Sequence, residues 1–285
     1  MKKYREKIMG GVFFTAALTS ILAVFLICLF LFVNGIPAIG KIGVFDFLLG
    51  KTWAPSNSPA SYGIFPMILG SIYITAGAVI VGVPIGILTS IFMAKYCPKK
   101  LYKILKPATE LLAGIPSVVY GFFGLVAIVP LIRTVFGGTG SSILAASLLL
   151  GIMILPTIIG VSESAIRAVP ESYYEGSLAL GASHERSIFK AVLPAAKSGI
   201  MAGVVLGIGR AIGETMAVIM VAGNQARMPA GLLKGIRTLT ANIVIEMGYA
   251  AELHREALIA TGVVLFIFIL IINLCFSVLQ RRDKK

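Results

Sequence analysis

The sequence predicts an all-α integral membrane protein with six transmembrane helices. Of its 285 residues, 58% are hydrophobic and only 13% are charged, and the mean hydropathy is +0.95. Soluble globular proteins average roughly 45–50% apolar and about 25% charged residues, so a water-soluble fold would leave too much apolar surface in contact with water. The three cysteines lie far apart, which excludes a disulfide scaffold, and the high hydrophobicity excludes a disordered chain.

Six apolar stretches are long enough to cross a bilayer, which takes about 20 helical residues. They cover approximately residues 11–33, 66–94, 108–132, 141–162, 198–222 and 257–279. The first stretch follows the basic segment MKKYREK, but it is longer than the core of a signal peptide, about 7–15 residues, so we interpret it as a retained span. We divide the chain into residues 1–60, with the first helix and first extracytoplasmic loop, and the transmembrane core 61–280.

The basic residues predict the orientation of these spans. Of the 25 Lys and Arg residues, 17 lie in the N-terminus, the 95–106 loop, the 163–197 loop and the C-terminus. Seven lie on the other side, and Arg210 lies inside a span. Because cytoplasmic loops carry the excess of Lys and Arg, we expect both termini and these two loops to face the cytoplasm. The net charge of +13 therefore reflects the orientation of the chain in the lipid membrane. We expect no nucleic-acid partner.

Arg210 and Glu214 are the most informative residues within the spans. They lie in GIGRAIGETMAV at positions i and i+4, so a continuous helix would place both on one face. Ionisable residues at bilayer depth usually face a bundle interior or an aqueous path. One interpretation is that the two side chains line a polar path, where the guanidinium binds an anion and Glu214 weakens that binding. The alternative is a self-neutralising pair that only locks this helix to its neighbours.

The loop between the fourth and fifth spans, VPESYYEGSLALGASHERSIFKAVLPAAKSGI, predicts two short helices. The first would run through Leu180, and Gly181 would take the left-handed conformation that often ends a helix. The second would run to Leu193 and stop before Pro194. Two projecting helices would form a docking surface, whereas an amphipathic connector lying on the membrane is the alternative.

This loop resembles the cytoplasmic motif E-A-A-x3-G-x9-I-x-L-P of ABC importer permeases, which fits a cleft on the ATPase subunit. Glu175, Gly181, Leu193 and Pro194 occupy matching positions, while Gly176, Ser177 and Ala191 replace the two alanines and the isoleucine. The replacements are small-for-small or apolar-for-apolar, so they preserve the physical character of the motif. The resemblance implies a six-helix ABC importer permease bundle in which residues 163–197 form the coupling loop.

Other segments resemble phosphate permeases of the PstC type: WAPSNSPASYGIFPMILGS, GIPSVVYGFFGL, RAIGETMAV, TLTANIVIEMGYA and ALIATGVVLFIFILIIN. The resemblance implies a PstA-like second permease, two ATP-binding subunits and an extracytoplasmic phosphate-binding protein as partners. Arg210 and Glu214 match the charged pair associated with the phosphate path. Ser117 and Tyr120 are weaker candidates for the same path, with helix packing as the alternative, and Pro116 is expected to break the helix there.

The chain contains no G-x-x-x-x-G-K-[ST] sequence, so we expect ATP hydrolysis on partner subunits and no enzymatic activity here. No metal or cofactor is expected. A permease for another oxyanion, sulfate or molybdate, stays open, whereas an intramembrane protease would need a nucleophile and base within the spans, and both histidines lie in loops. A secondary transporter would show inverted halves, which are not evident. We expect Trp53 to be an interfacial anchor, and Glu163 with Arg167 to be a solvated pair.

Overall fold

Within the described part of the chain, six helical segments are long and apolar enough to cross a membrane: Ile8–Ile42, Phe65–Tyr96, Ser117–Phe136, Ile143–Arg167, His184–Gly213 and Glu252–Phe276. The structure is a computed structural model and describes residues 2–282. Met1 and residues 283–285, which belong to the two basic termini used to predict the orientation, lie outside the described residues. The prediction of six spans in an all-α fold is confirmed.

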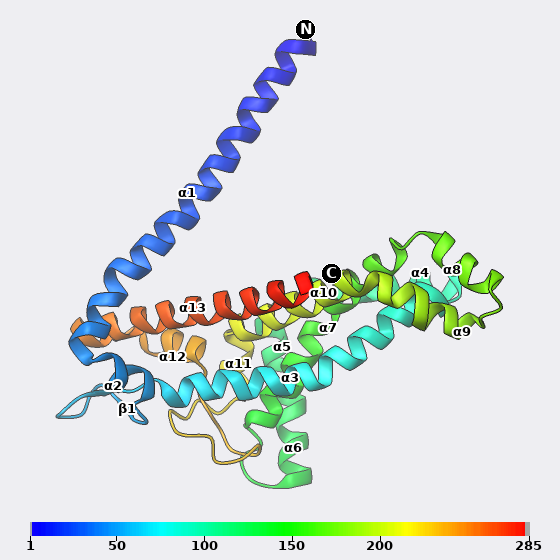
Figure 1. Cartoon of the computed structure of the whole chain (residues 1–285). Coiled ribbons are helices and arrows are strands. Elements are labelled where there is room, and N and C mark those ends of the chain that lie inside the picture. The colour runs from blue at the N-terminus through cyan, green and yellow to red at the C-terminus, as the bar shows by residue number, and fades with distance from the viewer. Residues whose placement is uncertain (1, 283–285) are drawn as a thin grey trace.

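The helices and strands follow one another as shown in Figure 1. In chain order they are α1 (Lys2–Ile42), α2 (Val44–Leu49), β1 (Trp53–Ala54), β2 (Ser61–Tyr62), α3 (Phe65–Ile91), η1 (Phe92–Tyr96), α4 (Lys99–Gly114), α5 (Ser117–Phe123), η2 (Gly124–Ile128), α6 (Val129–Phe136), α7 (Ile143–Arg167), α8 (Glu171–Ala179), α9 (His184–Ser187), η3 (Ile188–Val192), α10 (Leu193–Gly213), α11 (Met216–Val221), α12 (Leu239–Glu246) and α13 (Glu252–Arg282). The three η segments are single π-helical turns, and β1 pairs with β2 as a short antiparallel hairpin.

Helix α7 is the centre of the bundle and packs between α3 and α10. Glycines on α3 let the two backbones approach closely, since a Cβ at Gly77 would lie 2.3 Å from Ser147 Oγ. A Cβ at Gly82 would lie 2.8 Å from the carbonyl oxygen of Gly151. Lipid gives helices no hydrophobic reason to associate, so close contact between small residues supplies the packing energy. The glycines of the second span therefore allow α3 to pack closely against α7.

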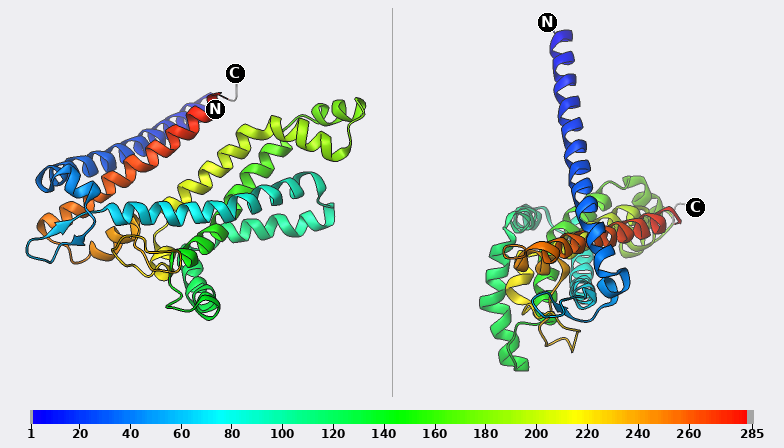
Figure 2. Two further views of the ribbon diagram at one scale, coloured as in Figure 1. Left: turned by 60° about the horizontal axis from the view of Figure 1, so that its bottom comes forward. Right: turned by 90° about the vertical axis from the view of Figure 1, so that its left-hand side faces the viewer.

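Helix α1 extends away from the rest of the bundle (Figure 1 and the right panel of Figure 2). Its C-terminal part packs on α13, where a Cβ at Gly35 would lie 2.6 Å from a methyl group of Val263. The apolar residues from Ile8 to Val33 are mostly exposed within this chain. Exposed apolar side chains on a helix of this hydropathy fit lipid or a neighbouring membrane protein.

The third span begins later than the sequence predicted. The expected span 108–132 starts within α4, an amphipathic helix that has no buried residues and ends at Gly114. The chain is extended at Ile115, and α5 begins after Pro116. Pro116 has no N–H to donate to the carbonyl of Leu112, and the Tyr120 hydroxyl donates to that oxygen instead, at 2.8 Å. The expected break at Pro116 is thus confirmed, and the start at residue 108 is wrong.

The fifth span also differs from the prediction at both ends. The expected helix 198–222 is interrupted, because α10 ends at Gly213 and α11 begins at Met216. At the other end Pro194 does not stop the helix, since α9, η3 and α10 run on as one segment from His184 to Gly213. Pro194 lies in the first turn of α10, directly after the π-helical turn, where its missing N–H breaks no regular α-helical ladder.

Candidate functional site

Arg210 lies in the last turn of α10 and is half-buried within the bundle. Its Nη1 donates to Thr157 Oγ1 on α7 at 3.3 Å. Within residues 2–282, no carboxylate lies within ion-pair distance of the guanidinium. Arginine stays charged in proteins, so this span carries a cation that the described chain does not neutralise.

Glu214 does not share a helix face with Arg210, contrary to expectation. It follows the end of α10 in an extended conformation with ψ of 134°. Its Oε1 accepts hydrogen bonds from the backbone N–H groups of Thr215, at 3.0 Å, and Ala217, at 3.2 Å. The carboxylate therefore caps the start of α11, where the amide groups attract negative charge. A self-neutralising pair has no support in this geometry.

Tyr120 and Ser117 lie just beyond the helix break on α5. Tyr120 is 6% exposed and belongs to the same buried cluster as Ala211, the residue after Arg210. Its hydroxyl is engaged by the Leu112 carbonyl. Ser117 is the half-buried first residue of α5, and its side chain makes no hydrogen bond within the described residues. The structure thus brings Tyr120 near the end of α10, with its hydroxyl already used by the backbone.

The four residues of the loop motif lie at the opposite end of the bundle from α12 and the β1–β2 hairpin (Figure 1). Glu175 is exposed on α8, and Gly181 has a φ of 84°, the left-handed conformation predicted for it. Leu193 and Pro194 begin α10. Helix α8 has no buried residue, and Leu180 at its end is 91% exposed. The motif therefore presents a free helical surface with an exposed apolar side chain.

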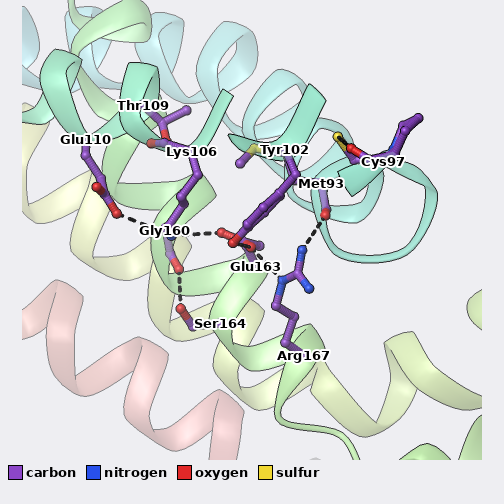
Figure 3. A network of polar contacts seen from close by, with 11 residues as sticks. Met93, Cys97, Tyr102, Lys106, Thr109, Glu110, Gly160, Glu163, Ser164 and Arg167 are labelled. Atoms are coloured by element: carbon purple, nitrogen blue, oxygen red, sulfur yellow. Dashed lines mark hydrogen bonds and ion pairs between the residues drawn. The ribbon is translucent and has the colours of Figure 1, made fainter. Parts of the chain in front are cut away.

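Near this end, Glu163 is only 1% exposed and accepts hydrogen bonds from three side chains (Figure 3). It accepts from Tyr102 Oη at 2.7 Å, Lys106 Nζ at 2.9 Å and Arg167 Nε at 2.7 Å. Arg167 also donates from Nη2 to the carbonyl of Met93, at 2.7 Å. The network joins α4, α7 and η1. Glu163 and Arg167 are therefore not the solvated pair that the sequence suggested.

The same contacts shift the pKa values of the two α4 groups. The hydrogen bond to Glu163 raises the pKa of the Tyr102 phenol above its ordinary value, and burial adds to the rise. The hydrogen bond to Glu163 also raises the pKa of the Lys106 ammonium, with burial opposing it. Tyr102 and Lys106 are four residues apart on one face of α4. This spacing was the available sequence signal for a buried acceptor, and sequence reasoning missed it.

A second buried carboxylate, Glu246, lies at the other end of the bundle. It accepts from Trp53 Nε1 and His254 Nε2, both at 2.8 Å, and from Arg237 Nη1. Trp53 is 7% exposed, so the expectation of an interfacial anchor is wrong. Arg237 also donates to the carbonyl of Asn224, which fixes the loop before α12. Glu246 thereby ties β1, this loop, α12 and α13 together.

The described residues thus form a multi-pass membrane bundle with six candidate spans, an arginine without a carboxylate partner near the interruption of the fifth span, and an exposed helical loop at one end. The comparisons with known proteins assign this bundle to the transport permeases of the cell membrane. Residues 86–284 match the family described as "Binding-protein-dependent transport system inner membrane component". This match covers more than half of the chain, so the protein belongs to that family and is the membrane component of an ABC importer, which works with other ABC subunits and a substrate-binding protein.

Relatives agree with this assignment, and a solved structure shares the fold. The chain is 40% identical over 278 residues to the probable ABC transporter permease protein YqgH of Bacillus subtilis, with 94% of this chain and 90% of the relative covered. It is 33% identical to the phosphate transport system permease protein PstC of Mesorhizobium japonicum, covering 90% and 84%. A chain of a bacterial alginate ABC transporter shares the fold, with a TM-score of 0.66, 17% identity and 98% coverage of both chains.

Proposed function

We propose that this chain is a permease subunit of an ATP-driven importer that moves inorganic phosphate across the cytoplasmic membrane. Relatives from distant organisms, among them Mesorhizobium japonicum and Methanocaldococcus jannaschii, carry PstC names and match most of the chain. The observation that carries the proposal is Arg210, whose guanidinium has no carboxylate partner among the described residues. The missing counter-charge is supplied by the transported anion.

The chemistry of arginine suits phosphate. A guanidinium presents parallel N–H donors that match two phosphate oxygens, and its positive charge strengthens both hydrogen bonds. Arg210 has one weak contact, at 3.3 Å to Thr157, so its remaining donors are available. A carrier must also release its cargo. We propose that Glu214, Ser117 and Tyr120 line the same path, with the Glu214 carboxylate moderating the local positive field.

The proposed assembly has two permeases, this chain and a PstA-like partner, with two ATP-binding subunits and an extracytoplasmic phosphate-binding protein. Both termini and the 163–197 loop face the cytoplasm. The ATP-binding subunit docks on the loop motif, Glu175, Gly181, Leu193 and Pro194, and covers the exposed Leu180. Because α9 continues through the π-helical turn into α10, movement of the loop passes along one continuous helical segment to Arg210.

Labelled-phosphate uptake tests the function. Cells carrying this chain with its transporter partners are compared with cells lacking only this chain, with excess sulfate or molybdate as competitor. The proposal predicts uptake that needs this chain and ATP and is unaffected by either competitor. Competition by sulfate or molybdate would reassign the substrate to that oxyanion. Uptake that does not depend on this chain would contradict the proposal.

Docking is tested separately by co-purification with the ATP-binding subunit. Gly181→Asp forces a side chain into left-handed backbone at φ 84°, and Glu175→Lys reverses an exposed charge of the motif. We expect both variants to insert in the membrane and to lose the ATP-binding subunit. Glu252→Lys, an exposed charge reversal at the far end, is the matched control. Undiminished co-purification of both motif variants would overturn the docking assignment.

A further inference from the structure

A cavity of about 400 Å³ lies beside the coupling loop. The loop is at the end of the bundle remote from α12 (Figure 1). It is lined by Ala94, Lys95, Arg167, Glu171, Tyr174 and His184. These residues come from η1, the end of α7, α8 and α9, so the cavity lies where the second span meets the loop. Nothing in the translocation path proposed above uses it.

Lys95 brings an ammonium group without hydrogen-bond acceptors to this cavity. Its side chain is 14% exposed, and the nearest carboxylate oxygen, Glu171 Oε2, is 3.9 Å from Nζ, beyond hydrogen-bond distance. Nζ makes no hydrogen bond to any described residue and lies 5.7 Å from the centre of the Tyr174 ring. A largely buried ammonium needs acceptors, so this group favours an anionic ligand in the space beside it.

Two further donors converge from other elements. Arg167 uses Nε for Glu163 and Nη2 for the Met93 carbonyl, and its guanidinium lies over the Tyr102 ring, 4.4 Å from the ring centre. Its Nη1 makes no hydrogen bond to any described residue. His184 Nδ1 lies 2.6 Å from Tyr174 Oη. When the phenol donates to Nδ1, the neutral imidazole carries its proton on Nε2 and becomes a second donor. Lysine, arginine and histidine donors therefore meet at one cavity.

The charge balance of the lining is positive. Glu163, beneath Arg167, is already engaged by Lys106 and Arg167, and it does not line the cavity. Glu171 is the one carboxylate among the lining residues, and its side chain is 64% exposed. The Glu171 side chain is the exposed member of this pair and its contact with Lys95 is long, at 3.9 Å, so Glu171 can turn into water when an anion enters.

We propose that this cavity is a second anion site and that it binds a phosphate group through Lys95, Arg167 and His184. The phosphate group comes either from free inorganic phosphate or from a lipid headgroup at the membrane surface. A bound phosphate would bridge η1 to α9 and so restrain the coupling loop. The consequence that imported phosphate slows its own import rests on the proposed function, whereas the binding site itself does not.

Equilibrium binding of labelled inorganic phosphate tests the site in the assembled transporter without its external binding protein. The complex is held in a maltoside detergent that contains no phosphate, with a non-hydrolysable ATP analogue filling the nucleotide sites. Arg210→Gln is the common background, so that the translocation path does not contribute. Lys95→Gln is expected to weaken phosphate binding about tenfold or more, the effect of one lost charge-assisted hydrogen bond.

Three comparisons make this experiment decisive. Lys95→Arg keeps the charge and restores binding, and Lys99→Gln, an exposed lysine outside the lining, leaves binding unchanged. Added phosphatidylglycerol identifies the source. The occupant is a lipid headgroup if two results agree. The added lipid displaces labelled phosphate, and, before any lipid is added, native mass spectrometry detects more bound phosphatidylglycerol in the complex with Lys95 than in the Lys95→Gln complex. If the added lipid does not displace phosphate, the occupant is the free ion.

Equal phosphate binding and equal lipid retention with Lys95 and with Lys95→Gln would overturn the proposal, provided that both complexes show the same unfolding midpoint. If Lys95→Gln changes the unfolding midpoint, the Lys95→Arg complex is compared with the Lys95 complex instead. Failure of Lys95→Arg to bind phosphate would also overturn the proposal. Failure of the proposed function gives a different result. In that case cellular phosphate uptake is independent of this chain, whether or not phosphate binds at Lys95.

Discussion

Charged side chains at the two ends of the bundle differ from Arg210 in its middle in the number of partners that they have. Glu163 at one end and Glu246 at the other are each almost completely buried, and each accepts hydrogen bonds from three side chains. Arg210, near the interruption of the fifth span, has one weak contact and no carboxylate among the described residues. The two carboxylates are thus surrounded by partners, as a buried charge that stabilises a fold must be, whereas the Arg210 guanidinium keeps most of its donors available, as the proposed role in anion transport requires.

The two carboxylates also differ from each other. The partners of Glu246 are themselves buried, since the side chains of Arg237 and His254 are 15% and 13% exposed. The partners of Glu163 reach water, with Lys106 at 29% and Arg167 at 44%. Loss of the carboxylate therefore leaves buried unpaired groups at one end and groups that can be hydrated at the other. The comparison predicts a ranking of stability effects.

Glu246→Ala is expected to have the largest effect on stability. It leaves Arg237 charged and unpaired and removes the acceptor of Trp53 Nε1, and breaking a buried pair in this way costs about 3–5 kcal/mol. The midpoint of thermal unfolding in detergent measures the loss. The isosteric Glu246→Gln retains one acceptor oxygen and should lose less. Equal midpoints for Glu246→Ala and the unmodified protein would show that this network does not hold the end together.

Glu163→Ala is expected to have a smaller effect, about 1–3 kcal/mol, because Lys106 and Arg167 can turn toward water. It should also loosen α4, whose own residues are all outside the core. Hydrogen exchange of the α4 amides measures this, and the amides of α3 serve as the internal control. Unchanged exchange in α4 would contradict the role of Glu163 as its anchor.

Tyr102→Phe is expected to cost about 1 kcal/mol, the usual net value of one hydrogen bond. The pH dependence is more specific. The raised pKa values of Tyr102 and Lys106 mean that their contributions are complete below the ordinary values, 10.0 and 10.5, and are lost as the pH rises through the folded-state values. Unfolding midpoints measured from about pH 8 to pH 11 should fall less steeply in Tyr102→Phe than in the unmodified protein. Parallel curves would show that Tyr102 does not contribute to the pH dependence of stability.

Arg210→Gln is expected to have the smallest effect on stability, within about 0.5 kcal/mol, because only the 3.3 Å contact to Thr157 is lost and an unpaired charge is removed. The unfolding midpoint again measures it. A drop as large as that of Glu163→Ala would indicate that Arg210 is held by partners and belongs with the structural charges.

Much of the architecture follows from local sequence features. Six apolar runs predict six helices, Pro116 predicts the break before α5, and the position of Gly181 predicts its left-handed backbone. Each of these depends on the nearby chain alone. The loop motif and the arginine within a span were recognisable for the same reason. The family assignment, an ABC importer permease, is confirmed by the match over residues 86–284.

The errors concern contacts between distant segments. Glu163 is buried because Tyr102 and Lys106, some 57 to 61 residues away, approach it from α4. Trp53 is buried because Glu246, 193 residues away, accepts its N–H. The end of α10 at Gly213 was missed because hydropathy continues through the interruption. There Glu214 and Thr240, 26 residues apart, hold the extended backbone by a hydrogen bond. Contacts between residues so far apart in the sequence can be identified only from the folded structure, because local periodicity does not specify them.

The most direct test of the central claim is labelled-phosphate uptake per assembled transporter in Arg210→Gln, beside the unmodified protein and Glu163→Gln. One lost charge-assisted contact to the anion corresponds to a fall of about 10- to 100-fold. We expect phosphate uptake in Arg210→Gln to fall by at least this factor while the unfolding midpoint stays unchanged. In Glu163→Gln we expect a lower unfolding midpoint and a much smaller loss of uptake. Uptake within about twofold of the unmodified rate in an assembled Arg210→Gln transporter would contradict the account, because the unpaired arginine would then not meet the substrate.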